Sequence, residues 1–350
     1  MRRILAAVAG GVIALALVAG PFWLPPVALI QLQHVFYLGV AIAGLNLLTG
    51  LTGQISVGHG AFMGIGAYVT VLSANAGLGH FTGLVLGVVL AGVTGLLCGL
   101  PALRIRGMYL AMVTIGLGIV FPQVIVRYTE VTGGTAGLRM NQKPPALISG
   151  STIASSYWIL LIITLVVGLL MWQVLGSRLG RSLLAVRDNE TAAGTLGVPV
   201  ARTKVLVYGV SAALAGLAGW MFATVNQYVS PADFSVFLSI NLLLAMVLGG
   251  PGTLLGPLLG GVYLAYSEEW IGEIGLNPQL TPAINGLLLI LVLFFLPGGI
   301  AGSLGNLLSR RPPRRDRSTD TDPDEPTPSP RTEGAEPPVP SGAHARGEFS

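Results

Sequence analysis

The chain has 350 residues, of which 52% are hydrophobic and only 10% are charged, and its mean hydropathy is +0.74. Soluble domains carry about 25% charged residues, so this composition excludes an ordinary water-soluble protein. Residues 1–307 hold only 12 basic and 7 acidic side chains, whereas residues 308–350 hold 7 arginines and 8 acids. We therefore expect a transmembrane body over residues 1–307 and a polar tail over residues 308–350. The isoelectric point of about 9.4 then reflects orientation in the bilayer, and nucleic acid is not expected as a partner.

Apolar runs of spanning length follow one another along this body, a spanning helix needing about 20 apolar residues. The full-length runs are Ile4–Leu24, Val27–Leu48, Phe81–Leu103, Met108–Val126, Ile153–Leu175, Val205–Val225 and Pro282–Ile300. Three shorter runs, rich in or bounded by Gly and Pro, are Gly58–Ala74, Phe234–Leu248 and Thr253–Tyr266. Since bare backbone is not tolerated in lipid, we interpret these as spans packed against protein. The sequence predicts an all-α fold, a polytopic transmembrane helix bundle of about ten crossings, some of them short or broken.

The basic residues predict how this bundle faces. With ten crossings and the N-terminus inside, the cytoplasmic cations are Arg2, Arg3, Arg104, Arg106, Arg178, Arg181, Arg187, Arg202 and Lys204. Those left outside are Arg127, Arg139 and Lys143. This distribution obeys the positive-inside rule. It requires two short crossings between residues 234 and 266, joined at Gly249-Gly250-Pro251-Gly252, and it puts both termini in the cytoplasm of a multi-pass plasma (inner) membrane protein.

Composition predicts the nature of both ends of the chain. Residues 308–350 contain mainly Pro, Ser, Thr, Asp, Glu and Arg, so this cytoplasmic tail is predicted to be disordered, with its first arginines near lipid headgroups. At the other end, Arg2 and Arg3 before an apolar run are also typical of a signal peptide. Because the run continues to Leu24, a retained helix gives the better topology.

The sequence lacks the motifs that mark ATP binding, metal-dependent catalysis and proton relays. There is no G-x-x-x-x-G-K-[ST] loop for ATP, no His-Glu-x-x-His pair, and only one cysteine, Cys98, which excludes an intrachain disulfide. The acids of the body fall at predicted loops or span ends, whereas a proton relay needs them at mid-membrane. We expect no catalytic residue, metal site or cofactor, and therefore a path-forming transport subunit driven by a partner instead of an enzyme.

The stretch 43–68, AGLNLLTGLTGQISVGHGAFMGIGAY, is an apolar helix pattern interrupted by Gly, Thr and Ser. Transporters use such unwound segments to present polar groups to a solute near the midplane. The side chains predicted to line a translocation path are Asn46, Gln54, Ser56 and His59. The alternative is a capped turn between packed helices, with His59 satisfied by backbone.

The loop 176–204, GSRLGRSLLAVRDNETAAGTLGVPVARTK, is the only long polar cytoplasmic segment before the tail. Ser182 is predicted to cap an amphipathic helix that runs to about Ala193, with Gly194 and Gly197 ending it. Such a helix suits docking into a groove on a partner protein. Its acids fit poorly with the alternative, a helix lying on anionic headgroups.

Six sequence blocks together resemble the permease of the branched-chain amino acid ABC importer family, specifically its M-type subunit. They are LNLLTGLTGQISVGHGAFMGIGAY, LRIRGMYLAMVT, TGGTAGL, GRSLLAVRDNETAAGTLGV, VSAALAGLAGWMFA and VLGGPGTLLGPLLG. They span roughly residues 35–300, so the tail lies outside the resemblance.

The resemblance implies a second permease subunit in a heterodimer, two cytoplasmic ABC ATPases that bind the ATP, an extracytoplasmic solute-binding protein, and a plasma-membrane setting among lipids. It also implies that loop 176–204 couples the permease to the ATPase. The coupling residues are then Arg187, Asp188, Asn189, Glu190, Ala192, Ala193 and Gly197. In this loop Thr191 stands where the broader motif has Glu. Urea or short amides as solute, and a self-sufficient carrier or channel, remain as alternatives.

Overall fold

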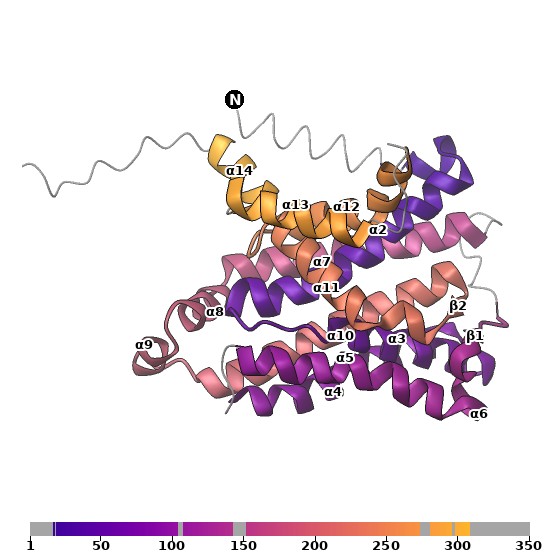
Figure 1. The fold of residues 1–350 in the computed structure, drawn as a ribbon, viewed down its shortest axis with the longest axis horizontal. Helices are drawn as coiled ribbons and strands as arrows, with labels where there is room; N and C mark the ends of the chain where they lie inside the picture. The colour runs from indigo at the N-terminus through magenta and orange to yellow at the C-terminus, as the bar shows by residue number, and fades with distance from the viewer. Residues whose placement is uncertain are drawn as a thin grey trace, which may run out of the picture. The chain divides into compact units, whose positions relative to one another are not determined.

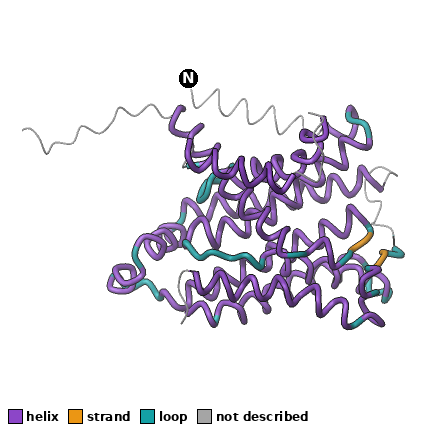
Figure 2. Tube along the Cα trace, viewed as in Figure 1, coloured by secondary structure: helices purple, strands orange, loops and turns teal. Residues whose placement is uncertain are grey.

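The computed structural model describes residues 17, 19–103, 108–142, 152–273, 281–295 and 298–308. Within these residues the chain is almost wholly helical (Figures 1 and 2), so the all-α prediction is confirmed. The predicted first helix lies largely outside the described residues, as does nearly all of the tail. The orientation cations that fall outside them are Arg2, Arg3, Arg104, Arg106 and Lys143.

The longer helices coincide with the predicted apolar runs. They are α2 (Pro26–Leu45), α3 (His59–Asn75), α4 (His80–Gly99), α5 (Met108–Arg127), α7 (Thr152–Gly176), α10 (Val200–Asn226), α11 (Val236–Gly249), α12 (Gly256–Glu273) and α13 (Thr281–Phe295). The short helical elements are η1 (Asn46–Gly50), η2 (Pro101–Leu103), α6 (Thr129–Thr132), η3 (Gly134–Ala136), α8 (Arg178–Asp188), α9 (Glu190–Thr195), η4 (Pro231–Phe234) and α14 (Gly299–Leu308).

Among the described residues, 5 helices are long and apolar enough to cross a membrane: Pro26–Gly50, His80–Leu103, Tyr109–Arg127, Thr152–Gly176 and Val200–Asn226. Helix α11 is apolar but shorter, as the sequence predicted for this span. The total of about ten crossings stays a prediction.

Helices α2 and α10 form the centre of the bundle. The most apolar windows of these two helices are 67% and 61% buried, against 28% or less for those of α4, α5 and α7. Helix α10 packs against α2, α3 and α4, while α2 also packs against α7 and α12. The outward faces of the peripheral helices carry large apolar side chains, which is the pattern that a lipid environment requires.

Close approach between these helices depends on small residues. The buried positions of α4 are His80, Gly83, Gly87, Ala91, Gly95 and Gly99, a repeat of four that forms one face of the helix. At the α3–α10 crossing, a Cβ added to Gly66 would overlap the carbonyl of Gly216. The small-residue spacing in the sequence therefore marks real helix contacts, as is common within membranes.

A two-stranded sheet, which the sequence did not predict, joins two loops at the end of the bundle away from α8 and α9 (Figure 1). Strands β1 (Leu138–Arg139) and β2 (Tyr228–Val229) pair antiparallel. The Tyr228 hydroxyl adds a bond of 2.7 Å to the carbonyl of Ala136. Strands of this length leave no alternating pattern to read.

The α3–α10 crossing gives a direct test of packing. Gly66→Ala should lower the free energy of unfolding by about 1–3 kcal/mol, the usual cost of overpacking, because its methyl group has no room against α10. The matched control is Gly116→Ala on α5, where an added Cβ meets nothing within 4 Å. Thermal denaturation of both variants in detergent measures the difference, and equal stability for the two would contradict the packing described.

Candidate functional site

The central helix α2 breaks as the sequence predicted. It passes into the π-helical turn η1 and stays helical to Thr52, after which residues 53–58 run as loop until α3 begins at His59. Gly53 starts the loop in a left-handed conformation, with φ +72°, which glycine adopts readily. Figure 2 shows the loop as an extended teal stretch between the helices.

Hydroxyl groups on other helices satisfy the backbone that this break releases. The Val57 N–H donates to Thr114 Oγ1 of α5 at 3.0 Å, and the Gly60 N–H donates to Ser239 Oγ of α11 at 2.8 Å. Such partners are required wherever backbone leaves a helix at membrane depth. The sequence analysis did not identify Thr114 or Ser239; the signal that could have found them is a lone hydroxyl in an apolar run.

Three of the predicted path residues gather against α10. Gln54, Ser56 and His59 are all buried, Ser56 and His59 completely. The Ser56 hydroxyl lies beside that of Tyr208, and His59 Nε2 is 3.5 Å from the Ser211 hydroxyl. Among the described atoms, Gln54 Oε1, Ser56 Oγ and His59 Nδ1 have no hydrogen-bond partner. Buried polar atoms of this kind call for a partner, and a polar solute is one kind of group that supplies it.

Asn46, the fourth predicted path residue, connects two breaks. Its Nδ2 donates to the Thr253 carbonyl at 3.0 Å, while its Oδ1 accepts the Gly252 N–H at 2.7 Å. Both partners lie in the segment between α11 and α12. The sequence predicted a turn at Gly249-Gly250-Pro251-Gly252, and the position of this turn is confirmed. The Asn46 amide therefore joins η1 to this turn.

The polar loop 176–204 contains two helices where one was predicted from Ser182 to about Ala193. Ser177, not Ser182, caps the first, with its Oγ accepting the Gly180 N–H at 3.2 Å. The chain then becomes extended at Asn189, whose Oδ1 caps α9 by accepting the Ala192 N–H at 3.0 Å. An Asn that caps a new helix competes with continuing the old one, which explains why the single helix was wrong.

Gly197 ends α9 in the left-handed conformation, with φ +84°. Its N–H donates to the Gly194 carbonyl, and the Val198 N–H donates to the Ala193 carbonyl, both at 3.1 Å. This pair of bonds is the Schellman ending, which favours glycine here. Ala193 is buried against the protein, whereas Leu196 is 80% exposed. Helix α9 thus offers an apolar side chain outward.

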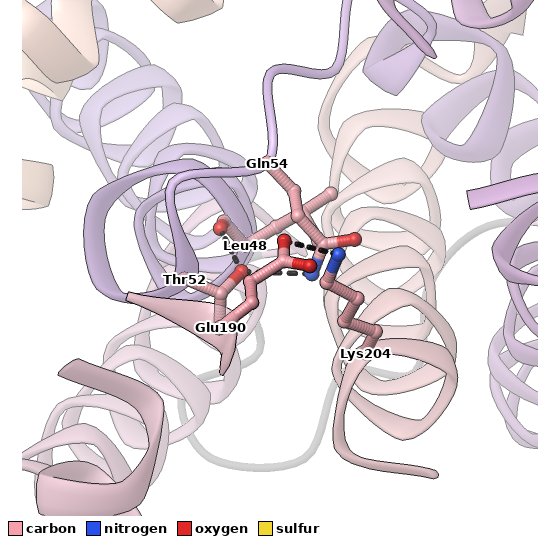
Figure 3. A network of polar contacts seen from close by, with 5 residues as sticks. All are labelled: Leu48, Thr52, Gln54, Glu190 and Lys204. Atoms are coloured by element: carbon pink, nitrogen blue, oxygen red, sulfur yellow. Dashed lines mark hydrogen bonds and ion pairs between the residues drawn. The ribbon is translucent and has the colours of Figure 1, made fainter. Parts of the chain in front are cut away.

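An ion pair fixes the start of α9 to α10. Glu190 pairs with Lys204, whose side chain is only 6% exposed while that of Glu190 is 28% exposed. Figure 3 shows this pair beside the end of the broken helix, where Gln54 Nε2 donates to Thr52 Oγ1 at 3.0 Å and Thr52 Oγ1 donates to the Leu48 carbonyl at 2.5 Å. The two groups of predicted site residues meet here.

A cavity of about 350 Å³ lies between these two groups. Its walls are formed by Thr52, Gly53, Gln54, Ile55, Leu110, Val186, Arg187, Asp188, Asn189, Glu190, Thr191 and Lys204. Across one edge of it, Arg187 Nη1 donates to the Gly50 carbonyl at 2.6 Å. The structure therefore brings the first four predicted coupling residues together with Gln54. The remaining predicted coupling and path residues do not line this cavity: Ala192, Ala193, Gly197, Asn46, Ser56 and His59.

The ion pair predicts a stability change. Glu190→Gln should lower the free energy of unfolding by about 2 kcal/mol, because it leaves the nearly buried Lys204 ammonium without its carboxylate. Asp188→Asn removes the same charge from an exposed side chain nearby and should change stability by less than about 0.5 kcal/mol. Thermal denaturation in detergent compares them; a shift for Asp188→Asn as large as that for Glu190→Gln would refute the special role of the pair.

These apolar helices, with a broken span and polar loops, define an integral membrane protein. Residues 27–293 match the family described as branched-chain amino acid transport system / permease component, and the chain belongs to that family. The match covers the helical body and confirms the family resemblance seen in the sequence.

The individual proteins to which the chain is similar agree with this family assignment. The chain is 32% identical over 282 residues to the high-affinity branched-chain amino acid transport system permease protein LivM of Escherichia coli, covering 73% of this chain and 66% of the relative. It is 25% identical over 292 residues to LivH of the same strain, covering 74% and 89%. The autoinducer 2 import system permease protein LsrC of Salmonella typhi is 28% identical over 258 residues, covering 70% and 71%. The chain thus spans slightly less than two thirds of the LivM length. No solved structure matches the chain.

Proposed function

We propose that this chain is one permease subunit of an ABC importer that carries branched-chain or other neutral amino acids across the plasma membrane. Family membership supports the permease role. The relatives named for branched-chain amino acid transport support the solute class. In this proposal the chain is a transport subunit without catalysis of its own.

The observation that carries the proposal is the shared cavity at the α8–α9 loop. A drive from a separate ATPase must reach the path through protein contacts. Here the loop that would receive it contacts the broken helix that carries Gln54, Ser56 and His59. Such contact allows two states of the loop to favour two states of the path.

The proposed partners follow from the family. They are a second permease subunit, two ATPases that bind the ATP, and an extracytoplasmic solute-binding protein. The chain's lack of a phosphate-binding loop motif agrees with ATP on another subunit. The basic residues Arg178, Arg181, Arg202 and Lys204 around α8–α9 favour a cytoplasmic loop, with both termini on that side.

We assign the path to Gln54, Ser56 and His59, and give Asn46 the separate task of holding the α11–α12 turn. Neutral amide, hydroxyl and imidazole groups suit a zwitterion, whose net charge is zero. They suit an amide equally, so urea or a short amide is the second candidate solute. The match to LsrC, named for autoinducer 2 import, supports a family scaffold that accepts different solutes.

Transport by the reconstituted complex tests the function. The chain is purified with co-expressed ATPases, second permease and binding protein, then placed in liposomes with labelled leucine or labelled urea outside. Uptake of leucine that needs ATP and an intact ATPase is expected. Uptake of urea alone favours the second candidate. Solute flux through the chain without any ATPase would contradict the proposal and support the carrier or channel alternative.

His59 gives a prediction on the path. His59→Gln should lower solute uptake about tenfold while leaving assembly intact, because the new amide cannot reproduce both ring nitrogens. The matched control is His80→Gln, which changes another buried histidine. His80 is not part of the break, and its Nε2 is 2.8 Å from Thr224 Oγ1. Initial uptake rates in liposomes measure both variants, and equal losses would remove the path role of His59.

A further inference from the structure

We propose that Arg187 is the positioning residue through which movement of the α8–α9 loop reaches the broken helix at residues 46–58. The inference rests on the proposed function, because it assumes that a partner moves this loop. It assigns Arg187 a task inside its own chain, instead of a contact with the partner. Arg187 is close to the broken helix at two points and to the turn between α11 and α12 at a third, and it stands at the joint between α8 and α9.

The first contact is a charge-assisted hydrogen bond. Arg187 Nη1 donates to the Gly50 carbonyl at 2.6 Å, and Gly50 is the last residue of η1. The chain leaves the helix three residues later, at Gly53, so no helical N–H follows that could pair with the Gly50 carbonyl. A cation at a helix C-terminus also interacts favourably with the helix dipole. The guanidinium, which comes from another segment of the chain, therefore caps the C-terminal end of the broken helix.

The second contact is packing of the side-chain stem. A Cβ added to Gly53 would lie only 3.3 Å from Arg187 Cγ, so the stem of Arg187 lies directly over the residue where the helix unwinds. The guanidinium of Arg187 thus contacts Gly50, and its aliphatic stem packs at Gly53, so one side chain holds both residues. Gln54, Ser56 and His59 follow within six residues of Gly53.

The third contact reaches the other break. A Cβ added to Gly252 would lie 3.7 Å from Arg187 Nη1 and 3.4 Å from the Gly50 carbonyl oxygen. The same turn is held to η1 by the Asn46 amide. Arg187 therefore lies where two non-helical segments meet, the loop at residues 53–58 and the turn between α11 and α12, and a displacement of its guanidinium disturbs both.

Arg187 also occupies a suitable place in the loop. It is in the last turn of α8, two residues before Asn189, where the chain turns extended and α9 begins. Glu190, on the far side of this joint, pairs instead with Lys204 of α10, a continuous helix of 27 residues. The loop is thus attached to a rigid helix on one side of the joint and to a broken helix on the other.

Hydrogen exchange of the full chain in nanodiscs tests the contact directly and needs no partner. The variants are Arg187→Ala and Arg187→Lys, the second keeping charge in case the first fails to fold. The matched control is Arg181→Ala, which changes an exposed arginine of α8 whose guanidinium donates to the carbonyl of Gly176 at the end of α7, at 3.5 Å. We expect amides 51–57 to exchange about tenfold faster in Arg187→Ala, with less change in Arg187→Lys and none in Arg181→Ala. Exchange unchanged at these amides would overturn the proposal.

The transmission itself is tested in the assembled transporter. Arg187→Ala should co-purify with the ATPases as the natural chain does, yet hydrolyse several times more ATP for each solute carried, because the movement of the loop no longer reaches the broken helix. Reduced co-purification with an unchanged ratio would mean that Arg187 docks the ATPase, and would overturn the proposal. If the natural complex itself shows no ATP-driven uptake, the proposed function fails, and the exchange result still decides whether Arg187 holds the break.

Discussion

Backbone released from a helix inside a membrane must find partners within the protein, and the rest of this structure depends on how that need is met. At the break, the Val57 N–H donates to the Thr114 hydroxyl, and the Gly60 N–H in the first turn of α3 donates to the Ser239 hydroxyl, so the two acceptors come from two different helices. The carbonyl just before it is satisfied by Arg187 from the polar loop. The hydrogen bonds that satisfy the break therefore connect α5, α11 and the α8–α9 loop to one short segment.

The close helix contacts serve the same end. Glycines at the α3–α10 crossing and along α4 let the backbones touch, so the break lies against α10. That placement brings Tyr208 and Ser211 beside Ser56 and His59. A bulkier crossing would move α10 away and separate the Ser211 hydroxyl from His59 Nε2, and a buried imidazole that loses a polar neighbour is destabilising.

Much of the fold could be predicted because its causes are local. Apolar runs located the described long helices, and clustered glycines located both the break near Gly53 and the turn near Gly250. The helix boundary at Asn189 was missed because Ser177, Ser182 and Asn189 are all competent caps, and tertiary contacts choose among them. The sequence grouped Arg187 with its neighbours as a coupling residue. Its acceptor is a backbone carbonyl 137 positions away, and a carbonyl leaves no mark in a sequence.

If Arg187 joins them, the α8–α9 loop and the broken helix move as one unit. Spin-label distances in the reconstituted transporter test it, with labels at Thr195 on α9, Ile55 in the break and Leu86 on the outer face of α4. We expect ATP binding to change both distances to Leu86 while the distance between Thr195 and Ile55 stays constant. A change in the Thr195–Ile55 distance, with Ile55 fixed relative to Leu86, would contradict it.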